Sequence, residues 1–418
     1  MTQTDFNQNL LDFLASSPTP FHATSQICLS LESSGFMRLD EADSWELKKG
    51  KKYFVTRNDS SCIAFIYGKE DICQTGMKMV GAHTDSPCLK LKPNTIIHKK
   101  GYIQLGVEVY GGALLNPWFD RDLSLAGRVS GLDGSGKLVH PLVDFKRPIA
   151  FIPSLAIHLD KEANKNRSIN AQTDIPPILM QSDESICFED ILLKETGLQE
   201  ILDFELMFYD TQAPAQIGFN SEFIVSARLD NLLSCFVGLE SIKEASSNKS
   251  ALLICSDHEE VGSESTSGAA GTFLEAVLKR IAPTHEDYSR MVNASMMISA
   301  DNAHGIHPNF STKHDENHGP LLNKGPVIKV NANQRYASNS QTISEFKLLC
   351  KKAKMPFQSF VTRTDMGCGS TIGPITATKI GVKTLDVGLP TFGMHSIRES
   401  AGDKDAFMLY EVLKVYFS

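Results

Sequence analysis

The sequence predicts an α/β protein that combines a three-layer α/β/α domain with an inserted, β-rich second domain. Helical and strand-like segments alternate near both ends of the chain, whereas Val- and Ile-rich runs broken by Gly, Pro and Asn fill the middle. The chain has 418 residues, which is long for a single hydrophobic core. We therefore expect residues 1–92 and 220–418 to form one discontinuous domain and residues 93–219 to form the insert.

The N-terminal segment is predicted to begin with an amphipathic helix over residues 5–16. Apolar side chains recur there at the i, i+4, i+7, i+8 spacing of one helical face, namely Phe6, Leu10, Phe13 and Leu14. Two prolines within residues 17–20 end this helix. Short apolar runs then predict three strands: Tyr53–Arg57, Cys62–Tyr67 and Lys78–Ala82.

The alternation of helices and strands returns after the insert. Helical spacing of apolar residues predicts helices over Asn231–Glu244, Ser267–Arg280 and Ser340–Ala353. Short apolar runs predict strands over Ser250–Cys255 and Met296–Ala300. Polar residues that follow such strands deserve notice, because α/β proteins bind ligands at the carboxyl ends of their strands.

The composition is that of an ordinary folded protein, with 42% hydrophobic and 22% charged residues. The net charge of −8 argues against nucleic acid or an anionic membrane as the main partner. The nine cysteines include no C-x-x-C pair, and their odd number fits poorly with a complete disulfide framework. No segment resembles a signal peptide or a membrane span, so we expect a cytoplasmic protein with reduced thiols.

Five acidic or histidine residues lie at the ends of predicted strands or in the adjoining loops. They are His83 in GAHTDSP, Asp230 in ARLDN, Glu260 in SDHEEVGS, Asp301 in SADNAH and His395 in GMHSIRES. Imidazole and carboxylate groups suit zinc, and two His with three carboxylates can hold two zinc ions if one carboxylate bridges them. Such a pair lowers the pKa of a shared water and supplies a nucleophile that can attack an amide.

Two further residues complete this predicted chemistry. Glu259 precedes Glu260, and because neighbouring residues of an extended segment point in different directions, one can bind metal while the other serves as general base. Asp85 follows His83 by two residues and can accept the second imidazole N–H, which fixes the orientation of the ring.

The sequence blocks around these residues resemble the signature blocks of the aspartyl aminopeptidase family. The blocks occur in family order over nearly the whole chain: GAHTDSPCLKLKP, ARLDNL, DHEEVGS, SADNAHGIHPN, KGPVIKVN, QRYAS, GCGSTIGP and MHSIRE. The resemblance implies a zinc-peptidase fold with two zinc ions per subunit. It also implies one zinc on His83, Asp230 and Asp301 and the other on Asp230, Glu260 and His395, with Asp230 as the bridge.

The same resemblance implies three properties that spacing alone does not indicate. Family members form tetrahedral dodecamers built from dimers, and the β-rich insert would serve that assembly. A histidine of the insert, His158 in SLAIHLD, would reach a neighbouring subunit's active site and stabilise the oxyanion there, although it could equally be an ordinary strand histidine. The peptide bond between Asp230 and Asn231 would be cis.

A preference for N-terminal Asp or Glu requires a cation in the substrate pocket. The candidates that the family blocks offer are Lys329 and Arg335, although a Lys after an apolar strand can also be a solvated strand-end charge. Gly369 and Ser370 in the GCGSTIGP loop could add backbone N–H donors. A nearby group of histidines in a Pro- and Asn-rich loop, His304, His307, His314 and His318, is more typical of solvated side chains, but its proximity to Asp301 permits a role in the pocket wall.

These observations predict a zinc aminopeptidase that hydrolyses the first peptide bond of peptides with a free N-terminus. The five ligands alone equally suit a carboxypeptidase or an N-acyl amino-acid deacylase, and only the family blocks favour the aminopeptidase. A non-catalytic, self-assembling scaffold that keeps the fold is a further alternative. The presence of both Glu259 and all five ligands argues against it, because an inactive protein has no need for buried carboxylates.

Overall fold

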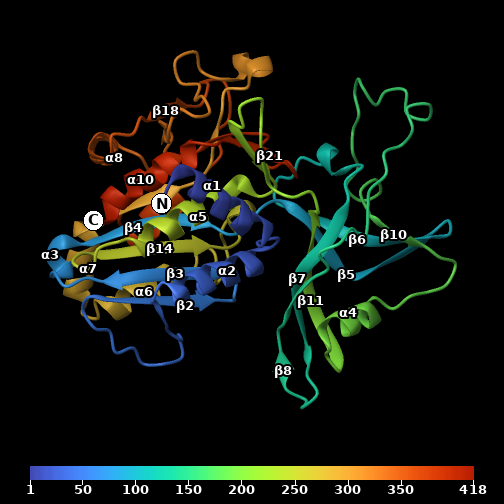
Figure 1. Ribbon diagram of the computed structural model, residues 1–418, viewed down its shortest axis with the longest axis horizontal. Helices are drawn as coiled ribbons and strands as arrows, with labels where there is room; N and C mark the ends of the chain where they lie inside the picture. Colours follow the sequence, from blue (N-terminus) through green and yellow to red (C-terminus); the bar gives the residue numbers. More distant parts are fainter. The chain divides into compact units, whose positions relative to one another are not determined.

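The computed structural model describes residues 1–418, which separate into two compact units (Figure 1). Unit 1 contains Met1–Asp85, Pro214–Met394 and Glu399–Ser418, and unit 2 contains Ser86–Ala213 and His395–Arg398. The chain thus leaves unit 1 once for the long insert and a second time for four residues near its end.

Unit 1 is built on a nine-stranded sheet with the strand order β1-β2-β3-β14-β4-β15-β19-β17-β18. Its strands are β1 (Met37–Arg38), β2 (Lys51–Arg57), β3 (Ser61–Tyr67), β4 (Met77–His83), β14 (Ser250–Ser256), β15 (Met296–Ala300), β17 (Val327–Val330), β18 (Gln358–Val361) and β19 (Lys383–Gly388). Strand β4 pairs in parallel with β14 on one side and with β15 on the other. The carboxyl ends of these three strands therefore meet at one edge of the sheet.

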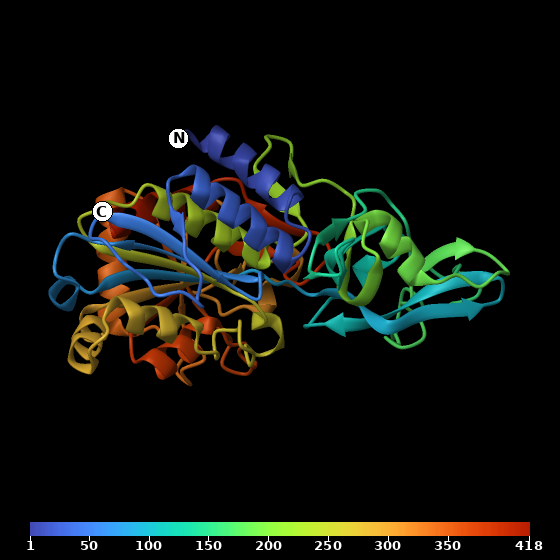
Figure 2. The same ribbon diagram turned by 90° about the horizontal axis from the view of Figure 1, so that it is seen from below.

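Helices cover both faces of this sheet (Figure 2). Alternate residues of β4 show why, because Val80 and Ala82 face one apolar core, whereas Met77 and Met79 face the other. The first core is closed by α1 (Gln3–Ala15), α2 (Pro20–Ser33), α5 (Leu229–Lys243), α8 (Ser340–Ala353) and α10 (Asp405–Phe417). The second is closed by α6 (Phe273–Ile281) and α7 (His285–Ala294). Two shorter helices complete the unit: α3 (Ile72–Thr75) and α9 (Ile372–Ile380).

A smaller, five-stranded sheet of unit 1 has the order β12-β13-β21-β20-β16. Its strands are β12 (Ala215–Ile217), β13 (Phe223–Ser226), β16 (Ala303–His304), β20 (Pro390–Phe392) and β21 (Glu399–Gly402). Two 3-10 turns, η2 (Glu259–Val261) and η3 (Pro308–Lys313), follow β14 and β16.

Unit 2 contains a seven-stranded antiparallel sheet with the order β10-β6-β5-β11-β7-β8, and β9 also pairs with β7. The elements are β5 (Cys88–Lys99), β6 (Tyr102–Tyr110), η1 (Asn116–Trp118), β7 (Leu123–Leu132), β8 (Leu138–Val139), β9 (Leu142–Asp144), β10 (Ile178–Gln181), α4 (Phe188–Thr196) and β11 (Glu200–Asp210). Phe188 and Leu192 of α4 pack into the apolar core of this sheet.

The structure confirms the predicted α/β class, but one predicted helix starts late and several helices, among them α2, were not predicted. The helix predicted from Ser267 begins only at Phe273, because Gly268 and Gly271 lie in a tight loop where an added Cβ would meet backbone oxygens within 2.2 and 2.5 Å. Helix α2 was missed because Pro20 was treated only as a helix terminator. Pro20 occupies the first turn of a new helix that Thr19 caps, where its missing N–H costs nothing.

Two global features complete the description. None of the nine cysteines takes part in a disulfide. No helix combines the length and the apolar character that crossing a bilayer requires.

Candidate metal centre

His83 lies at the centre of the candidate site, at the carboxyl end of β4. Its side chain is only 1% exposed, so carboxylates rather than water surround the ring. Nδ1 is 3.3 Å from Asp85 Oδ1, and Nε2 is 3.4 Å from Asp230 Oδ1 and 3.6 Å from Asp301 Oδ1. Burial opposes a charge on His83, but its hydrogen bonds to these three carboxylates outweigh burial and raise the pKa well above its ordinary value.

Asp230 and Asp301 are placed by backbone contacts at the same edge of the sheet. Asp230 lies at the start of α5, its N–H donates to Glu399 Oε2 at 2.9 Å, and the peptide bond to Asn231 is cis, as the resemblance predicts. Asp301 follows β15, and its N–H donates to Val387 O at 3.0 Å. The ligand atoms of His83, Asp230 and Asp301 lie within 4.8 Å of one another, which is close enough to share one cation.

Glu259 and Glu260 enter the site from η2, directly after β14. Both backbone N–H groups donate to the Asp85 carboxylate, Glu259 to Oδ1 and Glu260 to Oδ2, each at 3.1 Å. Their carboxylates form a second group with His83 that could hold a metal ion. Burial, partly offset by His83, raises the pKa of Glu259 to about 7, and burial together with the charge of Asp230 raises that of Glu260 to about 10.

This concentration of carboxylates fits a divalent metal. A set of buried acidic groups around one imidazole is costly without a cation, and imidazole with carboxylate oxygens is the donor set that zinc accepts. Asp85 takes a different position from the other acids, because it touches the outer ring nitrogen of His83 and two backbone amides. It holds the imidazole and the Glu259–Glu260 turn in one arrangement.

His395, the fifth predicted ligand, belongs to the four-residue segment that packs with unit 2. Its backbone is left-handed, with φ of 67°, and its Nδ1 lies 3.1 Å from Gly112 O. That contact leaves Nε2 as the nitrogen available to a metal. The metal-binding role of His395 remains a prediction.

Lys329 is not the solvated strand-end charge that the sequence also allowed, because it is only 3% exposed. Its Nζ lies 3.2 Å from Asp301 Oδ2 and 5.4 Å from the ring centre of Tyr336. Burial raises the pKa of Asp301, but the Lys329 charge and the hydrogen bond from His83 outweigh burial and hold it well below its ordinary value. Lys329 thus contacts a predicted metal ligand directly.

Arg335, Gly369 and Ser370 lie on two loops that meet beside a cavity of about 260 Å³. The exposed Arg335 donates from Nε to Cys368 O at 3.3 Å, and the Ser370 hydroxyl donates to Arg335 O at 3.5 Å. The cavity is lined by His304, Lys313, His314, Tyr336, Phe360, Thr362, Arg363, Met366, Gly367, Cys368 and Gly369. Its wall therefore combines two aromatic rings with several basic side chains.

Two of the four loop histidines, His304 and His314, line this cavity. His314 Nδ1 is buried without a hydrogen-bond partner. The other two are engaged elsewhere, since His307 packs against Phe310 and Phe392, and His318 lies 2.6 Å from Asp315 Oδ1. The sequence permitted a pocket-wall role for all four histidines, and the structure places two of them, His304 and His314, in the cavity wall.

Sequence reasoning missed Asp386, a fully buried carboxylate on β19. Its Oδ1 accepts from the Thr371 hydroxyl and its Oδ2 from Ala337 N–H, each at 2.6 Å. It thereby joins the loop that carries Tyr336 to the loop that carries Gly369 and Ser370. The available signal was the acidic residue within the apolar run TLDVGL, because a strand that is buried on both faces seldom carries a carboxylate without a partner.

His158 lies in an exposed turn of unit 2 rather than in a strand, so the ordinary interpretation as a strand histidine is wrong. The apolar residues around it are also exposed: Phe151, Leu155, Ile157 and Leu159.

Comparisons with known proteins agree with this chemistry. A family model described as Aminopeptidase I zinc metalloprotease (M18) matches residues 13–417. A protein named Probable M18 family aminopeptidase 2, from Pseudomonas syringae pv. syringae (strain B728a), is 56% identical over 422 residues, covering 99% of this chain and 98% of that protein. A chain in the cryo-EM structure of the Ape4 and Nbr1 complex is 39% identical with a TM-score of 0.95, covering 99% of this chain and 86% of that chain. A chain of the S. cerevisiae mApe1 dodecamer is 26% identical with a TM-score of 0.86, covering 99% and 96%.

Proposed function

Because this chain belongs to the M18 family of zinc aminopeptidases, we propose that it removes N-terminal Asp or Glu from peptides with two zinc ions per subunit. The observation that carries the metal assignment is the convergence of His83, Asp230, Asp301, Glu259 and Glu260 at one edge of the sheet. Family membership disfavours the carboxypeptidase, deacylase and scaffold alternatives, which the residue types alone left open.

In this proposal His83, Asp230 and Asp301 hold one zinc, and Asp230, Glu260 and His395 hold the other. When bound, the ions supply a Lewis acid and a water molecule of lowered pKa. Asp85 keeps the His83 ring oriented through Nδ1. His83 would lose the proton that it holds among the carboxylates when it binds a metal, so metal binding would be coupled to proton release.

Glu259 acts as the general base in the proposed mechanism. Its raised pKa, near 7 in the metal-free protein, shows that the position is poorly solvated and surrounded by acidic groups. Bound cations lower this pKa, which leaves a carboxylate that accepts a proton from the attacking water. Glu259 then returns that proton to the leaving amine, and His158 of a neighbouring subunit stabilises the oxyanion.

The preference for an acidic residue rests on the basic lining of the cavity. Lys313, His314 and Arg363 lie in its wall, and Arg363 is also paired with Asp365 at 2.6 Å. Gly369 contributes backbone at the rim, together with its neighbour Ser370. Lys329 assists from beside Asp301, where it links the pocket to the proposed zinc ligands.

Hydrolysis of aspartyl, glutamyl and leucyl p-nitroanilides by the zinc-loaded protein tests this function. We expect the acidic substrates to be cleaved best and Glu259→Gln to lower kcat by at least about 100-fold, the contribution of one positioned base. Preferred cleavage of the leucyl substrate would keep the aminopeptidase and refute the acidic pocket. Cleavage of none of the three would refute the proposed substrate class.

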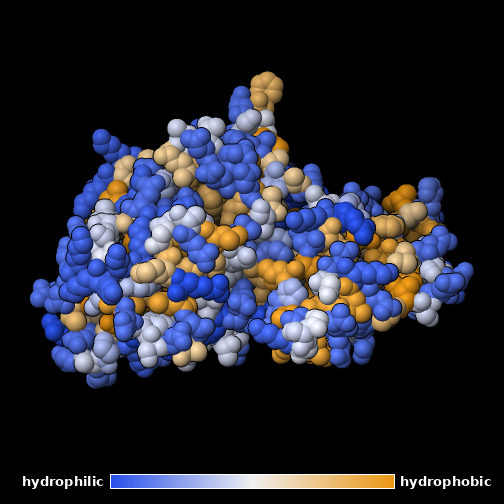
Figure 3. All heavy atoms as spheres, turned by 60° about the horizontal axis from the view of Figure 1, so that its bottom comes forward, coloured by the Kyte–Doolittle hydropathy of each residue, from blue (hydrophilic) through white to orange (hydrophobic).

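Self-association is the last part of the proposal. The solved mApe1 chain comes from a dodecamer, and the surface of unit 2 shows several hydrophobic patches (Figure 3). Leu159, next to His158, is 75% exposed, which is unusual for a leucine that has no partner. Unit 2 would then pair with a second copy of the chain and bring His158 to the neighbouring active site.

Mixing two inactive variants tests the role of His158 in trans. His158→Ala and Glu259→Gln subunits are co-expressed in equal amounts and should form mixed dimers. In each mixed dimer one of the two active sites then contains both Glu259 and the His158 of the neighbouring subunit. We expect about a quarter of wild-type activity from random pairing in a two-fold dimer. Activity no higher than the sum of the separate variants would refute the exchange of His158 between subunits.

A further inference from the structure

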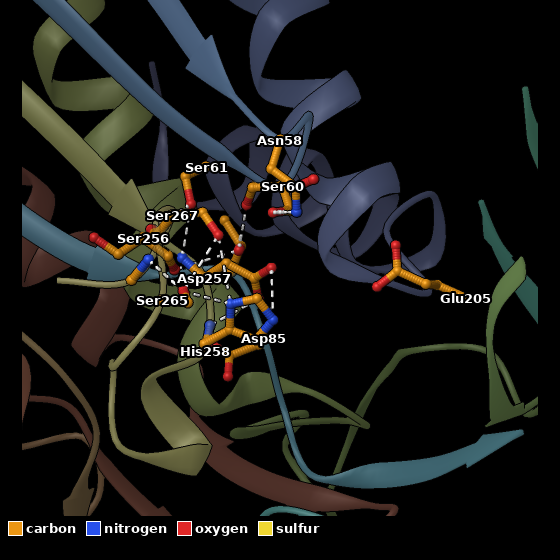
Figure 4. Close-up of polar contacts among 12 residues, drawn as sticks. Asn58, Ser60, Ser61, Asp85, Glu205, Ser256, Asp257, His258, Ser265 and Ser267 are labelled. Atoms are coloured by element: carbon orange, nitrogen blue, oxygen red, sulfur yellow. Dashed lines mark hydrogen bonds and ion pairs between the residues drawn. The ribbon is translucent and has the colours of Figure 1, made fainter. Parts of the chain in front are cut away.

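A cluster of polar side chains lies next to the Glu259–Glu260 turn and has no part in the mechanism above (Figure 4). Its centre is His258, the residue before Glu259. His258 Nδ1 lies 2.9 Å from Ser265 Oγ, and its Nε2 lies 3.6 Å from Asp257 Oδ2. The ring is thus hydrogen-bonded to the loop through Nδ1, while Nε2 faces a carboxylate.

Asp257 is itself firmly anchored, since it is only 2% exposed. Its N–H donates to Ser61 Oγ at 2.9 Å, and its Oδ1 accepts from His258 N–H at 2.8 Å. The Ser61 hydroxyl donates in turn to Ser267 O at 2.8 Å. The start of β3, the residue after β14 and the loop over residues 263–268 are therefore joined by one hydrogen-bonded network.

The protons of this network can be assigned so that each hydrogen bond has one donor and one acceptor. With the proton of the neutral ring on Nε2, that N–H faces Asp257 and Nδ1 accepts from the Ser265 hydroxyl. Ser265 Oγ also accepts from Gly268 N–H at 2.9 Å. Ser265 Oγ is the nearest hydroxyl to Nδ1, and Ser267 Oγ lies 3.4 Å from the same nitrogen, so both serines favour one orientation of the ring.

The backbone of His258 explains why this orientation matters for the next residue. His258 has φ of 61°, a left-handed conformation that few residues other than glycine adopt, and its carbonyl accepts from Ser263 N–H at 2.7 Å. The turn directs the N–H groups of Glu259 and Glu260 toward Asp85. The turn is therefore held from one side by Asp85 and from the other by the His258 ring.

We propose that His258 is a positioning residue for the general base: through Ser265 and Asp257 it fixes the turn from which Glu259 reaches the substrate water. The inference rests on the proposed function, because it needs Glu259 to be the base. His258 itself touches neither substrate nor zinc in this proposal. Since a misplacement of about 1 Å can cost on the order of 100-fold in rate, loss of the network should appear in kcat.

Four variants of the zinc-loaded enzyme test the proposal. Ser265→Ala removes the nearer hydroxyl partner of Nδ1, and Thr266→Ala is its matched control, because the Thr266 side chain makes no hydrogen bond in the network. His258→Leu removes both contacts of the ring. His258→Asn is the rescue variant, because asparagine tolerates a left-handed backbone and places a polar atom near the position of Nδ1.

The readouts are kcat and KM for aspartyl p-nitroanilide, zinc per subunit, and the midpoint of urea unfolding. We expect kcat to fall about 10-fold in Ser265→Ala and about 100-fold in His258→Leu, with KM and zinc content within about twofold of wild type. His258→Asn should recover most of the loss seen in His258→Leu, and Thr266→Ala should behave as wild type.

Three results would overturn the inference. The first is an unchanged kcat in Ser265→Ala and His258→Leu. The second is a loss of kcat that follows lost zinc or lost stability in proportion, because this would show a purely structural role. The third is failure of His258→Asn to exceed His258→Leu. By contrast, full activity of Glu259→Gln would refute the proposed function itself, whatever the His258 variants do.

Discussion

Replacing Lys329 by methionine should destabilise the metal-free protein far more than the zinc-loaded one. Lys329 Nζ lies 3.2 Å from Asp301 Oδ2, and the two side chains are only 4% and 12% exposed. The variant keeps the aliphatic volume but removes the lysine cation from buried Asp301, which then has His83 at 3.6 Å as a remaining partner. Removing one partner of such a pair costs about 3–5 kcal/mol.

Bound zinc should reduce this cost to less than half, because in our proposal the metal compensates the charge of Asp301. Urea unfolding with a chelator and with excess zinc measures both values. The chain has two tryptophans, and only Trp45 belongs to unit 1, where it stacks on Phe65 at a centroid distance of 6.2 Å. A Trp118→Phe background therefore makes the fluorescence report on unit 1 alone.

Lys324→Met is the matched control, since Lys324 precedes the same strand and is exposed. It should change the unfolding free energy by no more than about 0.5 kcal/mol. Equal destabilisation of Lys329→Met with and without zinc would refute Asp301 as a metal ligand. An unchanged stability of the metal-free variant would refute the buried ion pair.

Three further predictions concern pH, a buried hydroxyl and the pocket. In the metal-free protein burial raises the pKa of Glu259 from 4.5 to about 7, so the folded state keeps a proton that the unfolded chain has lost. This contribution to stability is full below about pH 4.5 and is lost as pH rises through about 7, and Glu259→Gln should weaken that pH dependence of urea unfolding. Tyr416→Phe should cost about 1–3 kcal/mol in the same assay, because the buried hydroxyl donates to Met296 O at 2.6 Å. Gly373→Ala should raise KM for aspartyl p-nitroanilide and cost about 1–3 kcal/mol of stability, because its Cβ would lie 2.3 and 2.4 Å from the Asp386 carboxylate oxygens.

Each of these has an outcome that contradicts it. Parallel pH profiles for wild type and Glu259→Gln would show that this carboxyl does not carry the linkage. A Tyr416→Phe variant as stable as wild type would show that water or a relaxed backbone satisfies the carbonyl. A Gly373→Ala variant with unchanged KM would show that Asp386 does not position the pocket loops for substrate binding.

The sequence predicted the framework of the site well, because strand ends and residue types carry that information. Strands β14 and β15 were predicted to within a residue, and the polar residues after them lie together as the α/β pattern requires. Family blocks added what spacing could not supply, including the cis bond after Asp230. The local pattern around His83 thus determined both its strand and its position.

The pocket and the supporting contacts were much less predictable, because they depend on residues far apart in the chain. Lys329 was predicted as a pocket cation, with a solvated strand-end charge as the alternative, but its contact with Asp301 was not foreseen. The role of Asp386 follows from its hydrogen bonds with Thr371 and Ala337, and no sequence periodicity connects these three residues. His258 was not singled out, because its partner Ser265 lies seven residues further on in a loop that no periodicity marks.

The strand order of the central sheet determines when its strands can pair during translation. Strands β3 and β4 are consecutive in the chain, yet β14 lies between them in the sheet, so until β14 exists β3 has only β2 as a neighbour and β4 has none. Roughly 170 residues separate His83 from the end of β14, and a ribosome needs about 10–30 s to make them. During that interval one edge of β3 and both edges of β4 are unpaired while the insert is made and can already fold. Chaperone binding to nascent chains should therefore peak after β4 and decline once β14 has left the ribosome.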